Sequence, residues 1–162
     1  MTEFLLIASI HLVAVISPGP DFAVVLRQSL SSTRRASIFT ALGIATSEFL
    51  HCLYSIFGME LIMRYQENIF LVLKPIAILY LMYLGISSFF TDRPSETVTR
   101  SSSKNFTLGF MTNLLNLQAS TFTVTLFFAI VSIETPLNIL ILYAVFIAIS
   151  TFVWFAFLSL LL

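Results

Sequence analysis

The chain has 162 residues, of which 58% are apolar and only 10% are charged, and its mean hydropathy is +0.99. A soluble domain carries about 25% charged residues, so this composition excludes an ordinary soluble enzyme, a nucleic-acid-binding protein and a disordered chain. Eight Lys and Arg residues balance eight Asp and Glu residues, and the single Cys52 excludes a disulfide framework and a clustered-cysteine metal site. The composition indicates an integral membrane protein.

Five hydrophobic stretches follow one another along the chain. A helix that spans a bilayer needs about 20 mostly apolar residues. Long gaps between charges give such stretches at about 3–26, 36–62, 69–90, 106–131 and 136–162. We predict an all-α bundle forming one transmembrane domain over 1–162. Its first three-helix half covers 1–90, a polar linker covers 91–105, and a second half with two helices covers 106–162. The first stretch lacks a basic flank and a cleavage site, so we expect it to be retained.

The basic residues predict the orientation. Six of the eight lie in the loops at 27–35 and 91–105, which the order of spans places on one side. Loops rich in Lys and Arg face the cytoplasm. We therefore expect a multi-pass protein of the cytoplasmic membrane, with its N-terminus outside and Leu162 near the inner face.

The segment Ser17-Pro18-Gly19-Pro20-Asp21 interrupts the first stretch. Each proline removes a backbone donor and restricts the residue before it, so this segment cannot continue a helix. One interpretation is a helix that breaks at membrane depth and restarts near Phe22. The other is a plain loop after a short first helix. We favour the break, because Phe4–Ile16 is too short to span a bilayer comfortably.

The second stretch carries Glu48 and His51 near its middle. They lie three residues apart and share a helix face. A charge at that depth costs about 2.5–3.5 kcal/mol on permissive scales, so the pair is expected to face the bundle interior or a wet cavity. It would either carry protons or simply join helices. His11 is most simply a packing residue, and no third ligand suggests a metal site.

The fourth stretch contains Asn113 and Asn116, which also share a face. Amides are costly in hydrocarbon unless they are paired. They could bind the charged ends of a substrate, accept the backbone groups freed by the break in the first stretch, or bond between helices. Gly43 lies inside the second stretch, where a small residue allows close helix packing.

Taken together, these segments resemble the LysE/RhtB family of amino-acid exporters, particularly its threonine and homoserine efflux members. The resemblance is carried by 11–30, with its SPGPD motif, by 34–58, by 78–89 and by 108–122. It implies six helices in two inverted three-helix halves, whose broken helices face each other, and export of an amino acid coupled to protons. By position, it implies a pathway formed by Ser17, Pro18, Gly19, Pro20, Asp21, Glu48, His51, Asn113 and Asn116.

The sequence departs from the family in two places. The family commonly has Asn-Pro-Lys in the fourth span, where this chain has Asn116-Leu117-Gln118, and it continues to a sixth helix, whereas this chain ends at Leu162. The alternative to an exporter is therefore a truncated paralogue that inserts without transporting. A homodimer could supply missing surface. We expect no cofactor and no enzymatic activity, since no nucleophile–base pair or metal cluster is evident.

Overall fold

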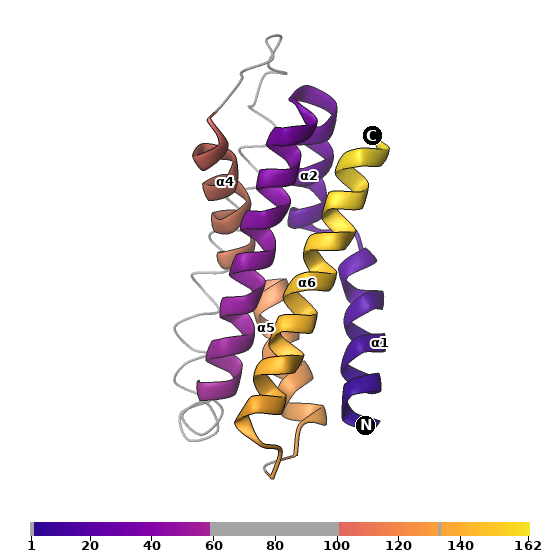
Figure 1. The fold of residues 1–162 in the computed structure, drawn as a ribbon, viewed down its shortest axis with the longest axis vertical. Coiled ribbons are helices and arrows are strands. Elements are labelled where there is room, and N and C mark those ends of the chain that lie inside the picture. The colour runs from indigo at the N-terminus through magenta and orange to yellow at the C-terminus, as the bar shows by residue number, and fades with distance from the viewer. Residues whose placement is uncertain (1, 59–100, 133) are drawn as a thin grey trace.

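The computed structural model describes residues 2–58, 101–132 and 134–162, and the regular structure of this part is helical. Figure 1 shows the helices running along one elongated bundle, with the two termini at opposite ends. They are α1 (Thr2–Ile16), α2 (Pro20–Ser31), an unlabelled helix over Arg34–Gly58, α4 (Ser102–Leu114), α5 (Leu117–Ile130) and α6 (Leu137–Leu161). The predicted span at 69–90, the end of the second span and most of the linker lie outside the described residues.

The helix lengths agree with a protein that crosses a membrane several times. The Arg34–Gly58 helix and α6 each have 25 residues and are apolar enough to cross a bilayer alone. The pairs α1–α2 and α4–α5 are each long and apolar enough only when taken together, and they bend by 53° and 60° at their breaks. The described part thus supplies two to four spans, which confirms the prediction of an all-α membrane protein.

The helices extend further than the hydrophobic stretches predicted. The expected loop at 27–35 is wrong, because α2 continues to Ser31 and the next helix begins at Arg34, leaving only Ser32 and Thr33 outside a helix. The expected linker is also too long, because α4 already begins at Ser102. The predicted bounds were based on charged residues, which indicate where a hydrocarbon layer would end. A helix can continue past that point into water, because its backbone hydrogen bonds are internal.

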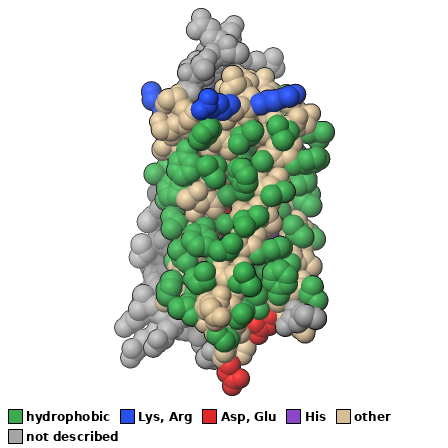
Figure 2. Space-filling view, viewed as in Figure 1, with side chains coloured by type: hydrophobic (Ala, Val, Ile, Leu, Met, Phe, Trp, Pro, Cys, Tyr) green, Lys and Arg blue, Asp and Glu red, His purple; other side chains and the backbone are tan. Residues whose placement is uncertain are grey.

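The charges lie at the two ends of the bundle. Figure 2 shows Lys and Arg side chains gathered at one end of a broad hydrophobic belt and Asp and Glu at the other. The described basic residues are Arg27, Arg34, Arg35 and Lys104, beside the turns that join α2 to the next helix and lead into α4. These four residues therefore lie at the end where the C-terminus lies, as the order of spans predicts for their segments.

Two glycines bring the Arg34–Gly58 helix and α4 into close contact. A Cβ atom added to Gly43 would collide with the backbone of Phe106, and one added to Gly109 would collide with the backbone of Thr40. At this crossing Thr40 Oγ1 donates to the carbonyl oxygen of Asn105 at 3.3 Å. Small residues allow such close helix approach in membranes. The prediction for Gly43 is confirmed.

Two apolar clusters lie above and below a polar middle layer. The cluster nearer the basic end contains Val25, Ala41, Ile44 and Phe155. The cluster nearer the acidic end includes Ile7, Ile56, Phe127 and Ile147. Figure 1 shows the break between α1 and α2 and the break between α4 and α5 near the middle of the bundle's length.

Candidate functional site

The first break has the form predicted from its prolines. α1 ends at Ile16, and α2 restarts with Pro20 at its first position, two residues before the expected Phe22. Proline suits this position because its missing N–H would have no partner there. Gly19 is extended, with φ −154° and ψ −171°. A helix of 12 residues follows the break, and α1 and α2 are apolar enough to form one span together, with a bend of 53°.

The second break forms without a proline. Between α4 and α5 the backbone of Asn116 is extended, with φ −80° and ψ 97°. The Asn116 side-chain oxygen accepts hydrogen bonds from the backbone N–H groups of Gln118 and Ala119, at 3.1 and 3.3 Å. An Asn cap satisfies donors that a helix start leaves unpaired. The cap therefore replaces the proline as the local cause of this break.

The two breaks lie side by side through contacts to Asp21. Asn113 Nδ2 and Asn116 Nδ2 donate to Asp21 Oδ2 at 3.1 and 2.9 Å. A Cβ atom on Gly19 would lie 3.5 Å from Gln118 Oε1. One alternative expected the asparagines to accept hydrogen bonds from the backbone groups freed at the first break, and they do not. They bond instead to the carboxylate that the first break places at the start of α2.

A second carboxylate shares one of these amides. Asn113 Nδ2 also lies 3.3 Å from Glu48 Oε2, and Thr123 Oγ1 donates to Glu48 Oε1 at 2.6 Å. Glu48 is 5% exposed, while the described Lys and Arg residues lie at the basic end of the bundle. The site therefore brings two carboxylates to mid-depth around one amide, and it suits a cationic group or a proton.

His51 lies next to Glu48 without forming a hydrogen bond. Its Nδ1 is 3.6 Å from Glu48 Oε2, which is beyond hydrogen-bond distance. Neither ring nitrogen has a hydrogen-bond partner among the described residues, although the side chain is 1% exposed. The two side chains do lie within salt-bridge distance of each other, so the helix connection and the proton carrier both stay predictions for this pair.

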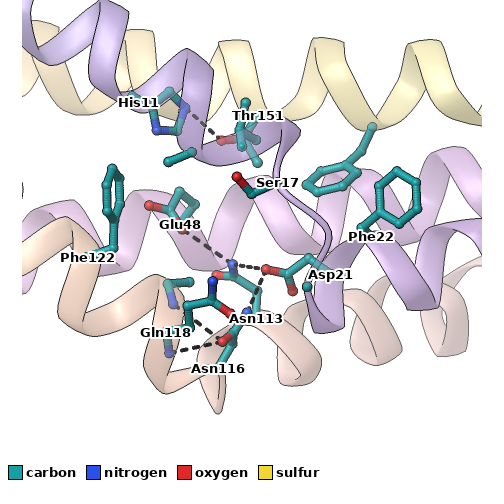
Figure 3. A pocket seen from close by; sticks show the side chains of 15 residues that line it. His11, Ser17, Asp21, Phe22, Glu48, Asn113, Asn116, Gln118, Phe122 and Thr151 are labelled. Carbon is teal, nitrogen blue, oxygen red and sulfur yellow. Dashed lines mark hydrogen bonds between the residues drawn. The ribbon is translucent and has the colours of Figure 1, made fainter.

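A cavity of about 300 Å³ opens between the two breaks. Figure 3 shows polar side chains of α1, α2, the Arg34–Gly58 helix, α4, α5 and α6 around it. Of the predicted site residues, Ser17, Gly19, Asp21, Glu48, Asn113 and Asn116 line this cavity, whereas Pro18, Pro20 and His51 do not. The volume is at the lower end of the range for small-molecule sites.

The opposite side of the cavity carries polar residues that sequence reasoning did not place there. His11 Nε2 and Thr151 Oγ1 form a hydrogen bond at 3.3 Å, and both residues line the cavity. Thr151 and its neighbour Ser150 are both hydroxyl residues in an apolar segment. The Ser150 hydroxyl donates to the carbonyl oxygen of Phe146 in its own helix. Hydroxyls in apolar helices usually bond this way, so no sequence signal separates the two. Gln118 and Phe122 also line the cavity.

Comparison with known proteins agrees with this architecture. The family model for LysE-type translocators matches residues 12–162. The chain is 28% identical to the threonine efflux protein of Escherichia coli K12 over 124 residues, 72% of this chain and 60% of that protein. It is 25% identical to the uncharacterized membrane protein YahN of Escherichia coli K12 over 160 residues, 95% of this chain and 72% of YahN.

A relative from Bacillus subtilis is similar to the same degree. The uncharacterized membrane protein YrhP of Bacillus subtilis is 27% identical over 158 residues, covering 89% of this chain and 75% of YrhP. No solved structure matches the chain. The family match extends over nearly the whole chain and includes both helix breaks. The protein belongs to the LysE-type translocator family of membrane proteins.

Proposed function

We propose that this chain exports a small amino acid across the cytoplasmic membrane in exchange for protons. The observation that carries the proposal is the meeting of two broken helices at a cavity lined by Asp21 and Glu48. Transporters bind substrates and coupling ions near the bilayer midplane, at breaks of this kind. Ionisable residues at membrane depth mark such pathways.

The unpaired oxygens of the cavity support an ammonium group as the bound part of the substrate. Asp21 Oδ1 and Asn113 Oδ1 are buried and accept no hydrogen bond within the described part of the chain. A buried acceptor without a donor is costly, and an ammonium group offers three N–H donors. Threonine and homoserine are the first candidates, because one relative is a threonine efflux protein.

Proton exchange follows from the same chemistry. An ammonium group and a proton both neutralise a carboxylate, so they compete for Asp21 and Glu48. A carboxylate pair at mid-depth that releases the substrate on one side and takes up a proton there would couple the two movements. From the positive-inside rule we expect the basic end of the bundle to face the cytoplasm, so export would run from that end toward Glu3 and Glu134.

Counterflow in proteoliposomes tests the proposal. Purified protein should exchange external radiolabelled threonine or homoserine for internal unlabelled amino acid, and Asp21→Asn should reduce the rate at least tenfold. Glu134→Gln, which changes an exposed carboxylate at the acidic end, is the matched control and should exchange like the native chain. A full-length threonine efflux protein verifies the assay.

The outcome separates the exporter from an inactive paralogue. If the native chain exchanges no amino acid while the relative does, the export proposal is wrong. The double variant Leu117→Pro, Gln118→Lys then asks whether the departures from the family motif are the cause. Exchange that appears only in the double variant would assign the loss to those two positions.

A further inference from the structure

We propose that Glu48, one of the two carboxylates for which the ammonium group and the proton compete, also connects the cavity to a separate buried proton branch through His51, whereas Asp21 has no such connection. This inference rests on the proposed function. It assigns substrate binding and proton movement to two sets of residues. Its starting observation is that the two carboxylates share Asn113 but have different surroundings beyond it.

The Glu48 carboxylate faces two environments. It lines the cavity and lies 3.3 Å from Asn113 Nδ2, and it lies 3.6 Å from His51 Nδ1. His51 does not line the cavity. The imidazole therefore lies beyond the carboxylate as seen from the cavity, at a distance that a small rotamer change would reduce to a hydrogen bond. Asp21 has no such second neighbour, because both of its described partners are asparagines.

His51 is poorly explained as a purely structural residue. Both ring nitrogens are buried and lack hydrogen-bond partners among the described residues, as does the hydroxyl of Ser47 one helical turn earlier. Leaving such groups unpaired costs free energy that an apolar side chain would avoid. An imidazole with one basic and one donor nitrogen can accept a proton on one side and release it on the other.

The branch leads away from the cavity toward an exposed hydroxyl. The His51 ring lies 5.3 Å from the ring of Tyr54, whose hydroxyl is hydrogen-bonded to Ser120. Tyr54 is 37% exposed, and neither Tyr54 nor Ser120 lines the cavity. The Tyr54–Ser120 pair therefore continues the polar groups beyond His51 at positions that do not line the cavity.

Within residues 2–58, 101–132 and 134–162, few ionisable groups lie around Glu48. Asp21 of α2 and His11 of α1 face it across the cavity, and Cys52 and Tyr54 lie on its own helix. The packed helices α4, α5 and α6 present the uncharged Asn113, Thr123 and Thr151. His11 already bonds to Thr151 and lines the cavity, so it belongs with the substrate. His51 is therefore the described imidazole available to the proton.

Two transport modes separate the branches. Counterflow exchanges substrate for substrate and needs no net proton movement. Net efflux driven by a pH gradient needs both the substrate site and the proton branch. His51→Gln should reduce gradient-driven efflux at least tenfold while counterflow stays within about twofold of the native rate. His11→Gln is the matched control: it changes the imidazole on the cavity side, so it should raise the KM for substrate and leave the ratio of the two modes unchanged.

The results that would overturn the inference are distinct from those that overturn the export proposal. Native protein without counterflow contradicts export itself. Native-like gradient-driven efflux in His51→Gln, with counterflow present, contradicts the proton branch. Loss of both modes in folded His51→Gln also contradicts it, since His51 would then act on the substrate.

A second variant decides the question if His51→Gln does not fold. Tyr54→Phe removes one hydroxyl from an exposed residue and keeps the ring beside His51. The inference expects a lower ratio of gradient-driven efflux to counterflow in this variant. An unchanged ratio would overturn the route through Tyr54 and, with it, the separate branch.

Discussion

At the scale of the residue, Asn116 joins the second helix break to the first. Its oxygen accepts two backbone hydrogen bonds at the start of α5, and its Nδ2 donates to Asp21 at 2.9 Å. The first role fixes where α5 begins, and the second orients a carboxylate in the cavity. These two roles use different atoms of one side chain, so substitutions can separate them.

We predict that Asn116→Ser keeps the cap and loses the contact to Asp21, whereas Asn116→Ala loses both. Replacing a cap by Ala costs about 0.5–2 kcal/mol, while Ser and Asn cap about equally well. In thermal unfolding of the detergent-solubilised protein, Asn116→Ala should therefore melt below Asn116→Ser. Counterflow should fall severalfold in both.

The control for this comparison is Thr112→Val, which removes a part-buried hydroxyl bonded only within its own helix. It should leave exchange unchanged. Equal melting temperatures for the Ala and Ser variants would contradict the capping role, and native exchange in both would contradict the role of the Asp21 contact.

At the scale of the element, α2 and α5 are half-helices that begin at the same cavity. Pro20 is the first residue of α2 and Leu117 is the first residue of α5, and each follows an extended residue. Both helix starts therefore need an extended residue followed by the first helical residue, and different side chains provide for this in the two helices. One start is fixed by proline, and the other is fixed by the Asn116 cap.

This equivalence predicts that Leu117→Pro is tolerated and stabilising. The first helical position needs no N–H partner, and an extended preceding residue is compatible with proline. Proline at a compatible site stabilises by about 0.4–1 kcal/mol through the unfolded chain. Thermal unfolding should show a small increase in melting temperature, with counterflow retained.

Leu126→Pro provides the contrast, because it lies inside α5 and would lose an internal hydrogen bond. It should prevent folding. If Leu117→Pro lowered the melting temperature as well, Leu117 would not be the first position of a half-helix, and the second break would differ from the one described.

At the scale of the whole molecule, the bundle has a basic end, an acidic end and a polar layer between two apolar clusters. Ser17 is exposed and lines the cavity in that layer, while Thr33 lies at the basic end and Glu134 at the acidic end. This arrangement predicts which positions water-soluble reagents reach from each side of a membrane.

We predict that Thr33→Cys reacts with a membrane-impermeant thiol reagent only from the cytoplasm and Glu134→Cys only from outside. Ser17→Cys should react with a small aqueous thiol reagent, because the cavity is hydrated. The native chain is the control, since its single Cys52 is fully buried. Complete protection of Ser17→Cys from both faces, in inserted protein, would refute a hydrated cavity.

Composition, charge spacing and proline chemistry are local properties, and they were enough to predict the membrane class, the helical fold and the break at Pro18 and Pro20. The order of spans also predicted which segments share an end of the bundle. Gaps between charges did not predict the helix ends, because Arg27 lies inside α2 and Lys104 lies inside α4.

Only the tertiary structure decided which polar groups meet. Asp21 and Asn116 are 95 residues apart in the chain, and Glu48 and Thr123 are 75 apart, yet both pairs form hydrogen bonds. Each of these residues needs a buried partner, but several candidates could satisfy that need equally well from the sequence. Close packing, made possible where Gly43 and Gly109 let two backbones approach, selects one set of partners and leaves His51 outside the cavity.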